Sequence, residues 1–155
     1  MTSAAEKGRA LLAQALATMR FRVRPETFTV VGLPRSGVAA ARAAVAGAGP
    51  DDVAQLTVEP DVITVVAREG LADSLAREPG ARVERGWRVV TFDTPMVFDV
   101  VGFLAKATGV LADAGVPLCA ICGFDRDHLF LRAEHLEAAR AALRAHLCPE
   151  ADAGS

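Results

Sequence analysis

Cys119 and Cys122 are residues whose type and spacing could do chemistry. Their C-x-x-C spacing is that of a redox pair or of half a zinc site. The segment around them has the composition of a strand, in which residues three apart point to opposite faces of the sheet. No second C-x-x-C or H-x-H spacing follows in the sequence. We therefore expect two small buried residues that pack as hydrophobes, with redox or metal chemistry as the alternative.

Asp125, Asp127 and His128 form a second group, at the tip of a predicted hairpin. A histidine beside carboxylates suits acid–base or metal chemistry. Aspartates in a turn also bond nearby backbone amides, so a purely structural turn is the main expectation. A ligand or interface contact and a catalytic role are the alternatives. Neither this group nor the thiols come with a nucleophile, a base and an orienting group, so we expect no enzyme.

The loop from Asp93 to Asp99 is the third group and the best candidate for a binding site. It joins the end of a predicted strand to the start of a predicted helix. Free N–H groups and the positive dipole end at a helix start favour a carboxylate. If such a ligand also carries a cationic group, either aspartate could pair with it. The alternative is that one of these aspartates caps the helix and packs there.

The elements that position these groups occur in the same order twice: strand, helix, strand, strand, helix. An N-terminal helix and a short strand at Phe21 to Val23 occupy residues 1–25, the first pass occupies 26–85 and the second 86–148. Strand counting leads us to expect that the short strand completes the sheet of the second pass. The small, polar segment 149–155 is expected to be a disordered tail.

Apolar and β-branched periodicity predicts strands at 27–32, 56–58, 62–66, 87–92, 116–124 and 128–131, and helices at 6–19, 37–46, 69–77, 99–114 and 134–147. Ser36 is expected to cap the second helix. Val101, Leu104 and Leu111 are expected to form the buried stripe of the fourth. The predicted fold class is α+β, with two ferredoxin-like β-α-β-β-α-β units whose antiparallel sheets carry helices on one face.

The composition of the chain excludes several classes of protein. Its 155 residues fit one domain or two small units, and 52% of them are hydrophobic, too many for a disordered chain. A net charge of −2 leaves no basic excess for a nucleic-acid partner. Apolar stretches such as Val62 to Ala67 are too short to span a membrane. The N-terminus reads as an amphipathic helix rather than a signal peptide, which favours a cytoplasmic location with reduced thiols.

The residues from Trp87 onward resemble the ACT domain family. A strand, a D-x-P-M loop at 93–96, a helix and the segment G-V-P-L at 115–118 follow the family's order. The stretch G-F-D-R-D-H-L-F-L at 123–131 is the most specific, because the family commonly has a glycine, an aromatic residue and then D-H-L-F-V. The chain looks like the small bacterial proteins with two tandem ACT-like domains. These are related to the ACT modules of aspartate kinases and to the eukaryotic arginine sensors.

The resemblance implies a regulatory module that binds a small molecule, with an amino acid or similar small carboxylate as ligand and no cofactor. Such a module acts through ligand-linked packing of its units or subunits, which implies a homodimer, and passes its output to an unidentified protein partner. The ligand-binding residues that the resemblance implies are Asp93, Thr94, Pro95, Met96, Val97, Phe98, Asp99, Cys119, Ile121, Cys122, Asp127 and His128. No catalytic or metal-binding residue is expected.

The chain departs from its relatives at two places. The relatives usually have serine-rich residues ahead of the helix, where this chain has P-M-V-F at 95–98. They tend to carry an asparagine and a valine in the strand where this chain has L-C-A-I-C at 118–122. These departures favour a more apolar ligand, or none. The alternative function is therefore an ACT-fold structural or interaction module without a metabolite, in which the apolar loop contacts a partner.

Overall fold

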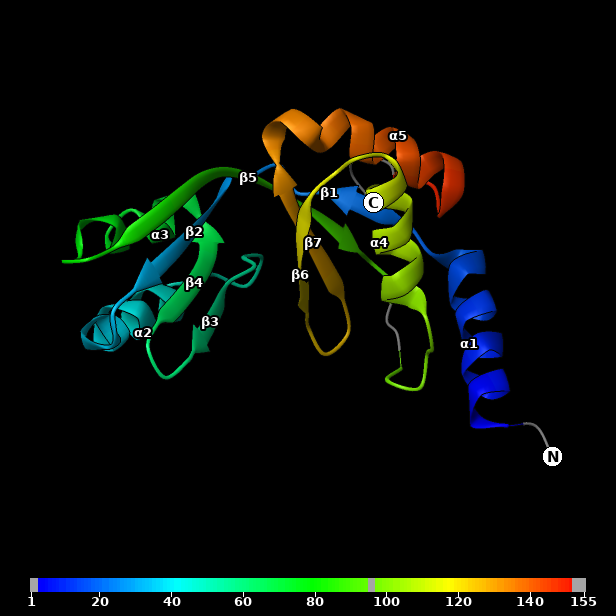
Figure 1. The fold of residues 1–155 in the computed structure, drawn as a ribbon, viewed down its shortest axis with the longest axis horizontal. Coiled ribbons are helices and arrows are strands. Elements are labelled where there is room, and N and C mark those ends of the chain that lie inside the picture. The colour runs from blue at the N-terminus through cyan, green and yellow to red at the C-terminus, as the bar shows by residue number, and fades with distance from the viewer. Residues whose placement is uncertain (1–2, 95–96, 152–155) are drawn as a thin grey trace. The chain divides into compact units, whose positions relative to one another are not determined.

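The computed structural model describes residues 3–94 and 97–151. The chain forms two compact units (Figure 1). The split unit comprises Met1–Arg24 and Val89–Ser155, and the inserted unit comprises Pro25–Arg88. Both units are α+β, with antiparallel strand pairs and helices, which confirms the predicted fold class. Within the described ranges, the helices are too short or too polar to cross a lipid bilayer.

The inserted unit is built on an antiparallel sheet with the strand order β3-β4-β2-β5. Its elements are β2 (Phe28–Leu33), α2 (Val38–Ala46), β3 (Gln55–Val58), β4 (Ile63–Arg68), the single-turn α3 (Glu69–Ala72) and the first part of β5 (Arg82–Phe92). The predicted strands at 56–58 and 62–66 are found as β3 and β4, which pair antiparallel with Val58 opposite Ile63. Alternate strand residues join α2 in one buried cluster that includes Val31, Leu33, Ala41, Ile63, Val65 and Ala67.

The split unit combines the two ends of the chain. Its elements are α1 (Ala4–Thr18), β1 (Phe21–Val23), the last part of β5, α4 (Phe103–Asp113), β6 (Leu118–Cys122), β7 (Asp127–Arg132) and α5 (Leu136–His146). Phe21 pairs with Phe92 and Val23 with Val90, so β1 joins the sheet of the second repeat, as strand counting predicts. The order continues from β5 through β7 to β6, which is the edge strand.

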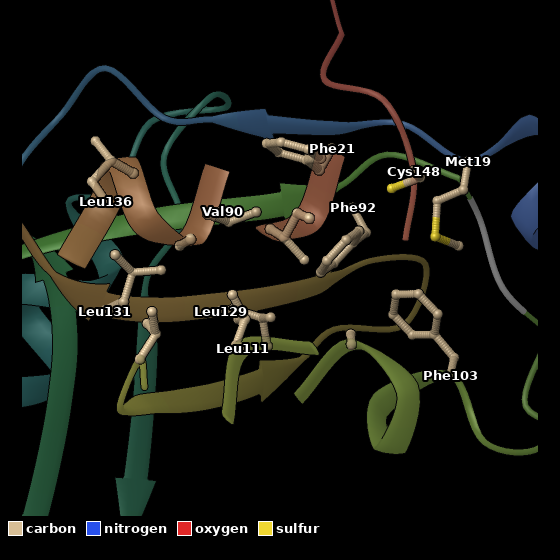
Figure 2. Packing of buried hydrophobic residues seen from close by; sticks show 14 residues of the cluster. Met19, Phe21, Val90, Phe92, Phe103, Leu111, Leu129, Leu131, Leu136 and Cys148 are labelled. Atoms are coloured by element: carbon tan, nitrogen blue, oxygen red, sulfur yellow. The ribbon is translucent and has the colours of Figure 1, made fainter. Parts of the chain in front are cut away.

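The core of the split unit lies between its strands and the helices α4 and α5 (Figure 2). Leu129 and Leu131 lie two residues apart on β7 and therefore point to the same side of the sheet. On α5, the buried residues Leu136, Ala139 and Leu143 follow the i, i+3, i+7 spacing of one helix face. Burying a side chain such as leucine contributes about 1.5–3 kcal/mol, so this cluster holds the helices on the sheet.

The start of α4 differs from the sequence prediction. The apolar residues Val100 and Val101 read as a first helical turn, but the helix begins at Phe103 after Gly102, whose φ is +95°. A left-handed φ of this kind suits glycine and interrupts a helix. The buried face of α4 is therefore Phe103, Ala107 and Leu111, while Val101 is exposed. Of the predicted stripe, Leu111 is buried and Leu104 packs partly buried against the core, and only Val101 is exposed.

The predicted cap at Ser36 is also wrong. Residues Arg35–Gly37 form a 3-10 turn, and α2 starts at Val38 with Gly37 in the cap position and no capping side chain. Gly37 is buried, and a Cβ there would lie 3.1 Å from Cβ of Leu33. The backbone of this tight turn passes close to Leu33. Gly37 takes the cap position of α2, and the side chain of Ser36 is exposed and does not cap the helix. The predicted helix at 69–77 is likewise divided into α3 and a 3-10 turn at Leu75–Arg77.

The chain after Pro149 is more ordered than the predicted tail. Phe21 donates a 3.2 Å backbone hydrogen bond to Pro149, and Ala151 donates one of 2.7 Å to Phe21. The Glu150 carboxylate accepts hydrogen bonds from Arg140 at 2.9 Å and 3.1 Å. It also accepts one from Arg144. These contacts hold residues 149–151 against β1, and the remaining predicted tail residues lie outside the described part of the chain.

Candidate functional site

A groove of about 390 Å³ opens on the split unit. Its walls come from the loop before α4, from the first turn of α4 and from the connection between β6 and β7. The lining residues are Val97, Phe98, Val100, Gly102, Phe103, Leu104, Ala105, Cys122, Gly123, Phe124, Asp125, Arg126 and Asp127. The volume lies at the lower end of the ~300–1,000 Å³ range of small-molecule sites. All three walls belong to one unit, so its fold alone positions them.

Phe103 fixes the helical wall of the groove. It is the first residue of α4, and its ring meets the ring of Phe92 edge to face, with centroids 4.9 Å apart (Figure 2). Phe92 is the last residue of β5 and is fully buried. An edge-to-face pair contributes about 0.5–1.5 kcal/mol beyond the burial of the rings. The start of the helix is therefore anchored to the sheet.

The start of α4 can receive an anion. Gly102 occupies the N-cap position and makes no side-chain cap hydrogen bond, and Gly102 to Ala105 line the groove. The first N–H groups of a helix have no partner within the helix, and the helix dipole adds positive potential there. A ligand carboxylate in the groove would satisfy these donors.

Two exposed phenylalanines stand on opposite walls of the groove. Phe98 belongs to the loop before α4 and Phe124 to the β6–β7 connection, and each side chain is 78% exposed. Their rings lie edge to face, with centroids 5.2 Å apart at 88°. Val97, 61% exposed, adds to this apolar edge. Adjacent exposed apolar side chains of this size commonly mark a binding surface.

The hairpin wall carries carboxylates and a thiol. Asp125 and Asp127 line the groove beside Cys122, which pairs with Asp127 at the end of the β6–β7 ladder. Burial raises the pKa of Cys122 to about 11, and a hydrogen bond and the charge of Asp127 act in the same direction. The thiol is therefore protonated at neutral pH and is not a nucleophile there. The carboxylates supply the negative charge that an ammonium group would seek.

The structure brings together four of the predicted site residues in this groove: Val97, Phe98, Cys122 and Asp127. Pro95 and Met96 lie outside the described residues. Thr94, Cys119, Ile121 and His128 do not line the groove. Ile121 pairs with His128 in the β6–β7 ladder, and the His128 ring nitrogen Nδ1 lies 2.9 Å from Oγ1 of Thr91.

Asp93 lies outside the groove lining, and Asp99 does not cap α4. Asp93 Oδ2 lies 2.5 Å from Nε of Arg22, and Oδ1 lies 3.7 Å from Nε of Arg126. This carboxylate is therefore already neutralised within the unit and does not line the groove. Asp99 is exposed and precedes the true helix start, so it does not cap α4. The cap expectation depended on a helix that begins at residue 99.

The cysteine prediction is wrong about burial. Cys119 and Cys122 are both exposed, and only Cys148 is buried among the three. The reason is that β6 is the edge strand, so it has a strand on one side only. In the portion of the chain that the structure describes, there is no group of three or more His, Cys, Asp or Glu side chains able to hold a metal ion.

Several lining residues were not found from the sequence, namely Val100, Gly102, Leu104 and Phe124. Phe124 carried a signal, because a large apolar residue in a polar turn is unusual. Gly102 carried another, because a glycine after two valines can end a loop and start a helix. Leu104 carried none, since an apolar helical residue reads as core.

The comparisons with known proteins agree with this architecture. The ACT domain family matches residues 82–145. A structure from Agrobacterium tumefaciens aligns with a TM-score of 0.65 and 21% identity, over 88% of this chain and 97% of that one. A Vibrio cholerae protein described as a possible transport protein aligns with a TM-score of 0.63 and 19% identity, over 90% of this chain and 98% of that one.

A further structural likeness concerns a protein of stated role. The regulatory subunit of aspartate kinase from Thermus thermophilus, in its ligand-free form, aligns with a TM-score of 0.60 and 16% identity, over 81% of this chain and 95% of that one. No curated protein matches this chain in sequence. Residues 82–145 of this chain therefore match the ACT domain family, and most of the chain shares the fold of these solved structures.

Proposed function

We propose that this regulatory ACT module binds an amino acid or a similar small carboxylate in the groove of the split unit. The observation that carries the proposal is that two walls of the same groove favour groups of opposite charge. The uncapped start of α4 favours a carboxylate, and Asp125 and Asp127 favour an ammonium group. A free amino acid presents these two groups on one carbon. The aspartate kinase regulatory subunit that this fold resembles is consistent with such a role.

Binding would act through linkage. A ligand that contacts both the loop before α4 and the β6–β7 connection binds most tightly to the conformation that allows both contacts. It therefore shifts the packing of the units or subunits toward that arrangement. The proposed output is a change in a homodimer or in an unidentified protein partner, with no chemical step on the ligand. The proposed location is the cytoplasm.

A second candidate function is an interaction module without a metabolite. The exposed Phe98, Phe124 and Val97 support it, because such a patch can also be covered by another protein. The two functions differ in what the protein binds when it is alone. Only the ligand-binding module gains stability from a free amino acid.

A thermal-unfolding screen against the twenty amino acids tests the proposal. A ligand that binds only the native state raises Tm by mass action. At a ligand concentration of one hundred times Kd, the free energy of unfolding rises by about 2.7 kcal/mol. We expect one or a few amino acids at millimolar concentration to raise Tm. Asp127→Asn should reduce the shift, and Asp73→Asn, an exposed carboxylate of the inserted unit, should leave it unchanged. A flat screen across all twenty would leave only the interaction module.

A further inference from the structure

We propose that the groove selects amino acids with a bulky apolar side chain, and that Phe98 and Phe124 are the residues that receive this side chain. This inference rests on the proposed function, because it names the ligand class of the same site. It concerns the part of the ligand that the two charged groups do not define.

The apolar walls of the groove carry the inference. Beside the two phenylalanines, the lining includes Val97, Val100 and Leu104. Phe98 and Phe124 each remain 78% exposed although they contact one another. Covering these two rings lowers the free energy of the complex, because contact between apolar surface and water is unfavourable. A ligand side chain that lies against them would remove that contact.

The position of the two rings matches a side-chain pocket. One ring comes from the loop before α4 and the other from the hairpin wall, and their centroids are 5.2 Å apart. A branched aliphatic or aromatic side chain lying against both rings contacts both walls at once. A small side chain such as that of alanine reaches neither wall fully. The geometry therefore rewards size as well as apolarity.

The charges around the groove disfavour other ligand classes. An acidic side chain would lie beside Asp125 and Asp127, which repel it. The cation of the hairpin wall, Arg126, is directed to Asp93 at 3.7 Å. A basic side chain would compete with the ligand's own ammonium group for the two carboxylates.

Melting curves of the full chain with a matched series of amino acids test the inference. The series is leucine, isoleucine, methionine and phenylalanine against alanine, arginine and glutamate, all at equal concentration. We expect the apolar set to raise Tm, with binding of leucine at least about tenfold tighter than that of alanine. Phe98→Ala and Phe124→Ala should remove this preference, and Phe124→Leu should retain most of it.

Val58→Ala is the matched control, because Val58 is an exposed apolar residue of the inserted unit, 48% exposed. It should leave the ligand series unchanged. Far-ultraviolet circular dichroism checks that each variant is folded. A larger shift with arginine or glutamate would overturn the inference and leave the proposed function standing. No shift with any amino acid would overturn both. If the Phe98→Ala and Phe124→Ala variants keep the apolar preference as fully as the Val58→Ala control does, the assignment to these two rings is overturned.

Discussion

The backbone N–H of Val101 donates a 3.3 Å hydrogen bond to the carbonyl oxygen of Gly8. This bond joins α1 to the loop before α4. Gly8 is buried, and its lack of a side chain lets the two backbones approach. Val100 and Gly102, on either side of Val101, line the groove. The N-terminal helix therefore supports one wall of the groove from outside it.

Gly8→Ala should destabilise the protein by up to about 2 kcal/mol. A Cβ at this position would lie 2.4 Å from Cγ2 of Val101 and 2.9 Å from the backbone oxygen of Asp99. Overpacking of this kind costs about 1–3 kcal/mol, and the better helix propensity of alanine returns only about 1 kcal/mol. Urea unfolding at neutral pH measures the change. Gly109→Ala in α4 is the control, because nothing lies within 4 Å of its Cβ and it should stabilise the chain. Equal stabilisation by both substitutions would contradict the packing at Gly8.

Glu150→Gln should loosen the end of the chain. Burial tends to raise the pKa of Glu150, but hydrogen bonds from Arg140 and Arg144 outweigh it, and the net pKa is lowered. A carboxyl with a lowered pKa stabilises the fold above its unfolded pKa and loses that effect as pH falls through the folded value. We expect faster hydrogen exchange of the Ala151 amide, which bonds to Phe21 at 2.7 Å. Protection in the wild type should fall toward that of the variant on acidification.

Glu137→Gln is the control for this experiment. Glu137 accepts a hydrogen bond from the same arginine, Arg140, at 3.0 Å, but its side chain is 79% exposed. Its loss should leave Ala151 protected. If both variants exchange alike, the carboxylate of Glu150 is not what holds this segment.

Cys122 should react slowly with alkylating agents at neutral pH, although it is exposed. Its pKa is raised to about 11, first by burial and then by Asp127, so the thiolate is scarce. In a Cys119→Ser variant, the iodoacetamide labelling rate at Cys122 should climb with pH well beyond pH 9. Asp127→Asn should move the curve to lower pH, because the hydrogen bond to a carboxylate and its charge are lost. A rate that levels off by pH 9 in the Cys119→Ser protein would refute the raised pKa.

His128 should make stability sensitive to pH. Burial lowers its pKa, the charges of Arg24 and Arg126 add to this, and Asp127 and Asp93 oppose it. The unfolded chain therefore takes up a proton more readily than the folded one. Stability is full above the unfolded pKa of about 6.5 and is lost as pH falls through the folded value. Urea midpoints from pH 7.5 to 5 should fall in the wild type and fall less in His128→Gln. His146→Gln, at an exposed site, controls for the loss of a histidine.

The repeated element order and most helices and strands could be predicted because their apolar periodicity survives in the structure. Leu136, Ala139 and Leu143 are an example, since the face that they predict is the buried face of α5. The start of α4 could not be predicted in this way, because Val100 and Val101 fit a helical period while the backbone of Gly102 breaks it. Periodicity reports which residues are apolar and not which φ a glycine adopts.

The groove was predicted in part, and the missing part depended on tertiary contacts. Val97, Phe98, Cys122 and Asp127 were singled out from their types and from the family pattern. The ion pair of Asp93 was not foreseen, because its partner Arg22 lies far from it in the sequence. A charged residue's availability for a ligand depends on such neighbours, which no local pattern reveals.

The split unit has a consequence for the order in which the protein forms during synthesis. α1 and β1 are made first, but β1 pairs with residues 90–92 of β5, so it has no strand partner until those residues are made. The inserted unit, Pro25–Arg88, is complete before then. We therefore expect the inserted unit to fold on the ribosome before the split unit does. The N-terminal segment has to wait for the rest of its sheet, and closing that long loop slows its folding.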